Sequence, residues 1–185
     1  TIAASINSTG QLTVNGGNIE TGGSSYGSLA GSGGIININS GTFTVGGDNT
    51  STTWSGTFGA VAGDLVKNGT GTLTLTGAPL NTGSTPAAST ISGGTLQIGT
   101  GAPLVVSGNF GGDVVNNGTL VVNNDAGGFF VVLKGLSGIG NLVKNGTGTL
   151  NSIGPIWTHS GNTTLNAGTI AASINSTGQL TVNGG

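Results

Sequence analysis

The sequence has almost no charged side chains. Its 185 residues include three lysines, five acidic residues, one histidine and no arginine. Charged residues make up 4% of the chain, against roughly 25% in an ordinary globular domain. A nucleic-acid-binding protein neutralises many phosphates with lysine and arginine. We therefore expect no nucleic-acid partner.

Cysteine and methionine are also absent. The lack of cysteine excludes a disulfide framework and a thiolate metal site. No apolar run approaches the roughly 20 residues of a transmembrane helix, so we expect no membrane span in this segment. The chain starts at Thr1 in the middle of its sequence pattern, as expected for a segment of a longer protein.

Glycine is abundant, with 40 residues, and the apolar residues lie in short alternating runs. Disordered chains combine low hydrophobicity with high net charge. Here the hydrophobic fraction is 34% and the mean hydropathy is +0.21. The pattern therefore indicates many short strands separated by turns.

One stretch, Gly63–Gly77 (GDLVKNGTGTLTLTG), shows this organisation clearly. It predicts a strand at Asp64–Lys67, a tight corner at Asn68–Gly71 and a second strand at Thr72–Thr76. Glycine and asparagine suit such a corner because they tolerate positive φ. The motif recurs at Gly140–Leu150 (GNLVKNGTGTL).

A longer duplication sets the period of the chain. Residues 1–17 (TIAASINSTGQLTVNGG) are identical to residues 169–185, so Thr169 restarts the sequence that begins at Thr1. Identity over this length does not arise by chance. We therefore divide the chain into one full repeat, residues 1–168, and the start of the next repeat, residues 169–185.

Within the repeat, short units of glycine, threonine or glutamine, and an apolar residue recur. Their apolar positions are Leu12, Phe43, Leu73, Leu96, Leu120, Leu150 and Ile170. Solenoid coils have periods of roughly 20–25 residues or somewhat more, and neighbouring coils stack to bury a shared core. We predict an all-β fold, a parallel β-helix of about seven or eight coils per 168-residue repeat. Further strands are expected at Ile35–Asn39, Thr53–Phe58, Leu104–Ser107, Phe129–Lys134 and Asn141–Lys144.

A β-meander or sandwich is the alternative architecture. Asn-Gly pairs occur at Asn68–Gly69, Asn117–Gly118 and Asn145–Gly146, and this dipeptide is a strong hairpin signal. Sequence periods of this length nevertheless favour the solenoid.

The two motifs also carry a family resemblance. Gly63–Gly77, followed by Asn81–Gly83 and Thr90–Leu96, resembles the passenger-associated repeat of Gram-negative autotransporters. Gly140–Leu150, followed by Ser160–Ile170, is similar to a second copy. The resemblance covers nearly the whole chain and implies a right-handed β-helix that is secreted or displayed at the cell surface. The stretch Asn151–Trp157 departs from the pattern, because another alternating strand is expected there.

No catalytic, cofactor or metal site emerges from the sequence, and we expect no enzyme activity. The carboxylates Glu20, Asp48, Asp64, Asp113 and Asp125 are scattered, whereas carbohydrate-cleaving enzymes use paired carboxylates. His159 lies next to Ser160, but adjacency in sequence is not the geometry of a catalytic triad. We interpret His159 as a loop residue.

Three features of the sequence bear on ligand binding. Lys67 and Lys144 occupy equivalent motif positions, and we expect them to be solvated at coil corners. A glycan- or protein-binding passenger would need an exposed aromatic cluster, for instance of Trp54, Phe58 and Trp157. An ice-binding solenoid would need a flat threonine ladder, such as Thr74 and Thr76 stacked with Thr13, Thr42 and Thr44.

We therefore expect this chain to have a structural role. The sequence predicts a repeat of an extracellular β-solenoid fibre or adhesin stalk, with identical repeats joined end to end. Low charge leaves little repulsion against lateral self-association. The ligand-binding passenger is the alternative, and the ice-binding solenoid is the less favoured one.

Overall fold

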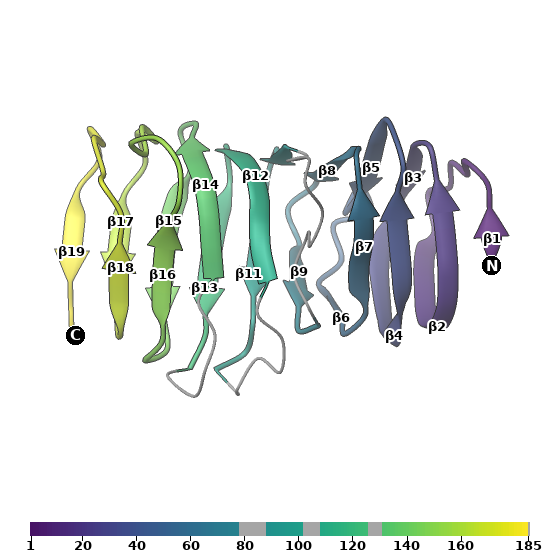
Figure 1. The fold of residues 1–185 in the computed structure, drawn as a ribbon, viewed down its shortest axis with the longest axis horizontal. Coiled ribbons are helices and arrows are strands. Elements are labelled where there is room, and N and C mark those ends of the chain that lie inside the picture. Colours follow the sequence, from purple (N-terminus) through teal and green to yellow (C-terminus); the bar gives the residue numbers. More distant parts are fainter. Residues whose placement is uncertain (78–87, 102–107, 126–130, 185) are drawn as a thin grey trace.

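The chain forms an elongated rod with its termini at opposite ends (Figure 1). A computed structural model describes residues 1–77, 88–101, 108–125 and 131–184. Within these ranges every regular element is a β-strand, and no helix is long and apolar enough to cross a membrane.

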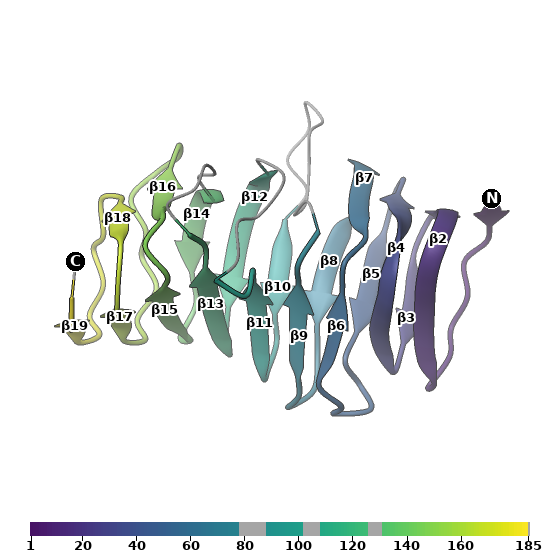
Figure 2. The ribbon, with the colours of Figure 1, turned by 90° about the horizontal axis from the view of Figure 1, so that it is seen from below.

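One sheet has 11 strands that are stacked along the rod (Figure 2). In stacking order its strands are β1 (Ile2–Ala3), β2 (Gln11–Thr21), β4 (Ser28–Ile38), β6 (Thr52–Trp54), β9 (Thr72–Leu75), β11 (Thr95–Ile98), β13 (Thr119–Asn123), β15 (Asn141–Asn145), β17 (Thr163–Leu165) and β19 (Leu180–Val182), and β7 (Thr57–Val61) pairs with β4.

The second sheet has eight strands, and from β8 onward its strands alternate along the chain with those of the first sheet. In stacking order they are β18 (Thr169–Ala171), β16 (Thr149–Ser152), β14 (Val131–Ser137), β12 (Gly108–Asn116), β10 (Ser89–Ile91), β8 (Asp64–Lys67), β5 (Thr42–Val45) and β3 (Ser24–Tyr26).

All strand pairs of the described residues are parallel, and this distinguishes the two predicted architectures. The strands β8 and β9 flank the Asn68–Gly71 corner but do not pair with each other. Instead β8 pairs with β5 and β10, and β9 pairs with β6 and β11. The Asn-Gly pair therefore turns a solenoid corner and closes no hairpin. The predicted β-solenoid is confirmed, and the sandwich alternative is wrong.

About six turns are complete within the described residues, which differs slightly from the seven or eight coils expected for a repeat. Most expected strands coincide with observed ones, although Thr53–Phe58 is divided between β6 and β7. The expected strand Leu104–Ser107 lies outside the described residues. So do the first two residues of Phe129–Lys134.

The core is a column of inward side chains within the coils. In β9, Leu73 and Leu75 are buried while Thr72 and Thr74 are half-buried on the outside, because strand side chains alternate. The next coil repeats the pattern, with Leu96 and Ile98 of β11 in register with the two leucines. Inward apolar residues therefore stack on one another from coil to coil.

Glycine is required where two coils approach at a corner. Gly69 has a φ of +66°, and a Cβ there would collide with the carbonyl oxygen of Gly46 in the preceding coil. Glycine adopts this conformation at little cost, and its lack of a Cβ avoids the collision. The corner of the LVKNGTGTL motif therefore follows from both backbone conformation and coil spacing.

One ladder of the first sheet can be followed through the whole rod. It begins at Val14, which lies beside Gly31 in the β2–β4 pair. From Gly31 the successive partners are Trp54, Leu75, Ile98, Val122, Lys144, Leu165 and Val182. The ladder thus begins and ends on the same residue of the duplicated segment, because Val182 is the counterpart of Val14 in the second copy.

The two copies of the LVKNGTGTL motif behave differently. The first copy runs from β8 in the second sheet to β9 in the first sheet, whereas the second runs from β15 in the first sheet to β16 in the second. Each copy forms a strand, a corner and a strand. The motif therefore specifies a local corner and not a fixed position around the coil.

Candidate functional site

Lys67 and Lys144 point into the solenoid, so the expectation that they are solvated at corners is wrong. Lys67 is 1% exposed and Lys144 is 0% exposed. Lys67 follows Leu65 on the inward face of β8, and Lys144 follows Leu142 on the inward face of β15. Strand alternation therefore places each lysine in the core column.

Each buried ammonium group is held by backbone carbonyl oxygens, two of them from its own corner. Lys144 Nζ donates to the Asn145 and Gly146 oxygens at 2.6 and 2.7 Å, and more weakly to the Ala167 oxygen of the next coil at 3.5 Å. Lys67 Nζ repeats the arrangement with the oxygens of Asn68, Gly69 and Gly93, at 2.6, 3.4 and 3.4 Å. The two lysine corners thus give a hydrogen-bond donor to carbonyl groups of the tight turn.

Burial shifts the protonation equilibrium of both lysines toward the neutral amine. It lowers the pKa of Lys144 to about 8. Burial also lowers the pKa of Lys67, and the negative charge of Asp48 partly opposes that shift. Asp64, on the outward face of β8, is exposed and accepts a hydrogen bond from the backbone N–H of Ala88.

The carboxylates are separate and serve local structure. Asp48 accepts hydrogen bonds from Ser28 Oγ at 2.7 Å and from the hydroxyl and N–H of Thr50 at 2.7 and 2.9 Å. These bonds lower the pKa of Asp48, with the Thr50 hydroxyl contributing most. Within the described ranges, no three acidic, histidine or cysteine residues lie together as a metal site would require.

Glu20 binds side chains of the adjacent coil. Its two oxygens accept from Asn37 Nδ2 at 2.7 Å and from Asn39 Nδ2 at 2.9 Å. The side-chain bonds from Asn39 and then Asn37 lower the pKa of Glu20. This carboxylate therefore links two coils across the outside of the rod.

His159 lies in a loop, as interpreted from the sequence, and its side chain is buried. Its Nε2 lies 2.8 Å from Thr163 Oγ1. Burial lowers the pKa of His159, which favours the neutral imidazole. The neighbouring Ser160 hydroxyl donates to the Gly138 carbonyl at 3.4 Å. These bonds give His159 and Ser160 separate partners.

The aromatic side chains are core residues. Trp54 and Trp157 are completely buried, and Phe58 is 2% exposed. Trp54 packs edge-on against Phe58, with ring centroids 4.8 Å apart. The exposed aromatic cluster that a ligand-binding passenger would need is therefore not formed by these three residues.

The threonine ladder considered for ice binding is not formed as expected. Thr74 stacks between Thr53 and Gln97 in the first sheet. Thr44 lies in the second sheet, and Thr13 pairs with Ala30. The expected threonines therefore belong to different ladders and do not make one flat array.

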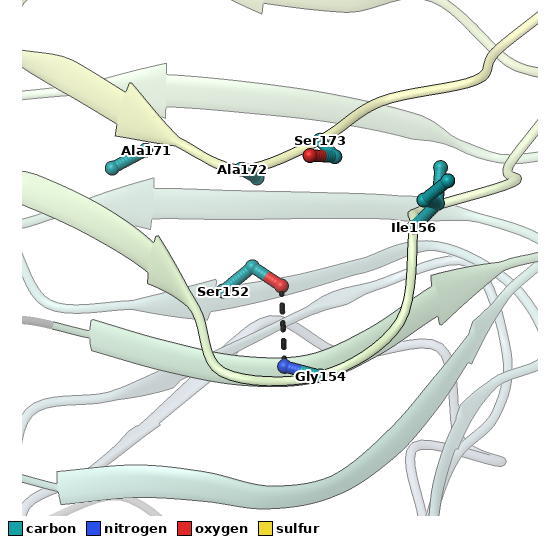
Figure 3. Close-up of a pocket in the computed structure, with 6 residues that line it drawn as sticks. All are labelled: Ser152, Gly154, Ile156, Ala171, Ala172 and Ser173. Atoms are coloured by element: carbon teal, nitrogen blue, oxygen red, sulfur yellow. Dashed lines mark hydrogen bonds between the residues drawn. The ribbon is translucent and has the colours of Figure 1, made fainter.

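Two hollows lie near the C-terminal end of the rod. One, of about 330 Å³, is lined by small or apolar residues and by the hydroxyls of Ser152 and Ser173 (Figure 3). The other, of about 180 Å³, is lined by Thr163, Ile174, Ser176, Gly178 and Leu180. Neither lining contains a charged residue, so neither hollow offers a charged group for acid–base chemistry.

The two copies of the duplicated segment lie at the two ends of the rod. The duplicated segment forms the first coil, with Ile2 and Ile6 exposed by 56% and 42%, while Val14 is 4% exposed. In the last coil, the equivalent Ile170 and Ile174 pack partly buried against the core, while Val182 is 61% exposed. The same sequence is thus covered on opposite sides in its two copies.

No known family, curated protein or solved structure was found to match this chain.

Proposed function

We propose that the chain is a structural repeat of an extracellular bacterial β-solenoid, serving as a fibre or adhesin stalk in surface attachment, aggregation or biofilm matrix. In this proposal the function depends on the length and the stiffness of the rod. Each repeat supplies a segment of rod, and the next identical repeat continues the same ladders.

The closure of the ladder is the observation that carries this proposal. Because the ladder runs from Val14 to Val182, the repeat contains a whole number of coils. A following repeat would meet the last coil in the register that β4 has with β2. No linker or change of direction is needed at such a junction.

The contacts of the two copies of the duplicated segment support the same conclusion. In a continuous rod the duplicated segment would contact one coil before it and one coil after it. The first copy shows the contact with the following coil, and the second copy shows the contact with the preceding coil. In a tandem array Leu180 and Val182 would be covered as Leu12 and Val14 are. Their exposure of 63% and 61% would then be lost.

Asparagine side chains on the outside of the rod form a hydrogen-bonded ladder, and a following repeat would continue it. Asn166 Nδ2 donates to Asn145 Oδ1 at 2.8 Å, and Asn183 Nδ2 donates to Asn166 Oδ1 at 2.7 Å. In the first coil the equivalent of Asn183, Asn15, accepts from the backbone N–H of Ser32 at 3.0 Å. The following repeat would bring the same donor to Asn183.

The location at the surface of a Gram-negative bacterium rests on the resemblance of the two LVKNGTGTL motifs to passenger repeats. An architecture that is held by backbone ladders and a thin apolar core needs no cofactor, and it therefore suits a chain that is exported from the cell. Cell fractionation and surface proteolysis of the parent protein test this part of the proposal.

Electron microscopy of chains with one, two and four copies of the 168-residue unit tests the fibre. At ~4.8 Å per coil, about six to eight coils per repeat predict about 30–40 Å of added rod per copy. Straight rods of increasing length support the proposal. Beads joined by flexible segments would refute it, and would favour closed domains with a binding function.

A further inference from the structure

The outer face of the first sheet carries side chains in straight rows along the rod, where β9, β11, β13, β15 and β17 are stacked (Figure 2). We propose that this face is a lateral interaction surface, and that its partner is the same face of a second copy of the rod. Two rods then lie side by side with their rows in contact. The inference rests on the proposed fibre function, because the face continues only where one repeat follows another.

The central row of this face is one ladder of outward residues. In order along the rod its members are Thr53, Thr74, Gln97, Val121, Val143, Thr164 and Thr181. Six of these seven residues are β-branched. Because β-branched side chains have few rotamers, they lose little conformational freedom when a second surface packs against them.

Polar side chains flank the central row on both sides. One flanking row contains, in register, Thr72, Thr95, Thr119 and Asn141. In the other, Thr76 Oγ1 donates to Ser55 Oγ at 2.8 Å. Further along that row, Asn166 Nδ2 donates to Asn145 Oδ1 at 2.8 Å. These bonded groups keep partners within their own rod when a second rod displaces water, which limits the cost of burying them.

The residues named in the three rows are all uncharged. Charged side chains lie instead on the second sheet, where Asp64 and Asp113 are exposed and Lys134 is half-buried. Two copies of the uncharged face therefore meet without repulsion between like charges and without burying an unpaired charge. Val121 and Val143 are neighbours in the central row, so they supply an apolar centre with polar rows at its rim.

A second rod also matches this surface in its period. Strands stack at the same ~4.8 Å spacing in both rods, so a contact made at one coil can be repeated at the next. Both rods use the same patch, and such an isologous contact is closed once two copies have joined. The expected assembly is therefore a pair of rods.

The area of the face indicates how many repeats a stable pair needs. From Thr53 to Thr181 the central row is about 30 Å long at ~4.8 Å per strand, and the three rows are about 13 Å wide at ~3.3 Å per residue. Contact then covers about 400 Å² on each rod, or about 800 Å² in total, for each repeat, whereas stable interfaces bury roughly 1,200–2,000 Å² in total. A pair of single repeats falls below this range, and a pair of two-repeat rods reaches it.

Chains with one, two and four copies of the 168-residue unit test the pairing. The width of rods in electron micrographs separates pairing from end-to-end growth, and sedimentation over a range of protein concentrations gives the dissociation constant of the pair. We expect single-copy chains to stay one rod wide and two-copy chains to become two rods wide. Pairing of the two-copy chains should be at least about 100-fold tighter.

Matched valine substitutions in the two-copy chain locate the surface. Val143→Lys places a charge in the central row and should weaken pairing by about tenfold or more, because that charge is buried against the second rod. Val115→Lys is the control and should pair as wild type does, because Val115 is 37% exposed on β12 of the second sheet. Circular dichroism melts check the folding of each variant. Thr74→Lys, on another strand of the central row, is a second variant that should weaken pairing.

Three results would overturn the inference. Two-copy and four-copy chains that stay one rod wide at every concentration would show that the face does not pair. Equal loss of pairing in Val143→Lys and Val115→Lys would show that pairing does not depend on this face, and bundles wider than two rods would contradict a single pairing surface. In each case, rods that still lengthen with copy number leave the proposed fibre function standing.

Discussion

The two lysine corners predict that the protein becomes more stable as the solution is made alkaline. A lysine whose folded pKa lies below its unfolded value favours folding in its neutral form. The unfolded chain then binds more protons, so the free energy of unfolding rises with pH between the two pKa values. For Lys144 this window runs from about 8 to the unfolded value of 10.5.

The size of the effect follows from linkage. Between pH 7 and pH 9.5 a shift of this size corresponds to about 2 kcal/mol at most. The carbonyl oxygens around Nζ also stabilise the ammonium form, so we expect about 1–2 kcal/mol. For a chain of this length that is a rise in Tm of about 2–8 °C. Lys67 adds an effect of the same sign.

The other titratable groups with shifted pKa values change the free energy of unfolding mainly outside this pH window. Burial raises the pKa of Tyr26 above 10, so its ionisation lowers stability only at higher pH. The pKa of His159 is lowered from 6.5, so its contribution is nearly complete at pH 7. Glu20 and Asp48, with lowered pKa values, act in acid.

Urea unfolding at pH 7 and at pH 9.5 measures the prediction in wild type, in Lys144→Met and in Lys134→Met. Methionine fills the core but cannot titrate, so Lys144→Met should lose most of the alkaline gain. It should also be less stable than wild type at pH 9.5, because the corner carbonyls lose their donor. Lys134, a half-buried lysine of β14, is the control. An alkaline gain of the same size in Lys144→Met as in wild type would refute the reasoning.

Three further predictions concern stability and are measured by thermal and urea unfolding. Leu73→Asp should cost more than about 4 kcal/mol because it buries an unpaired charge, whereas Thr74→Asp on the outside of the same strand should cost less than about 1 kcal/mol; similar losses would contradict the inward assignment. Gly69→Ala should cost about 1–3 kcal/mol through its positive φ and its collision with the preceding coil, while Gly47→Ala, with open space around it, should be nearly neutral. Trp157→Ala should cost about 3–5 kcal/mol by opening a core cavity, and a melt unchanged from wild type would show that the side chain is not packed.

Periodicity made the solenoid predictable, and strand alternation could also have placed the buried lysines. The alternation that places Leu73 and Leu75 inward puts Lys67 on the side of Leu65, and the same rule applies to Lys144. Lysine side chains are rarely buried, so residue type alone favours the solvated position that the structure contradicts. What the residue types did not reveal is that the tight corners supply carbonyl acceptors to a buried ammonium group.

The candidate sites were less predictable because they depend on which coils become neighbours. Thr74 and Thr44 look alike in sequence, yet one belongs to a ladder of the first sheet and the other to the second. The gaps between units vary, so the sequence alone does not give the register. Only the ladder from Val14 to Val182 shows that one repeat makes a whole number of coils.

The position of the LVKNGTGTL motif at two different corners bears on how such a gene can change length. Recombination between the two 17-residue duplicates removes or adds one whole repeat, and every downstream residue keeps its face of the coil. Recombination between the two motif copies would instead delete one copy together with everything between them. In the product, β8 of the second sheet would be followed by the residues that normally follow β15 of the first sheet. The downstream strands would then be rotated around the coil by part of a turn. Expansion and contraction of the gene by whole repeats is thus the change that the core tolerates.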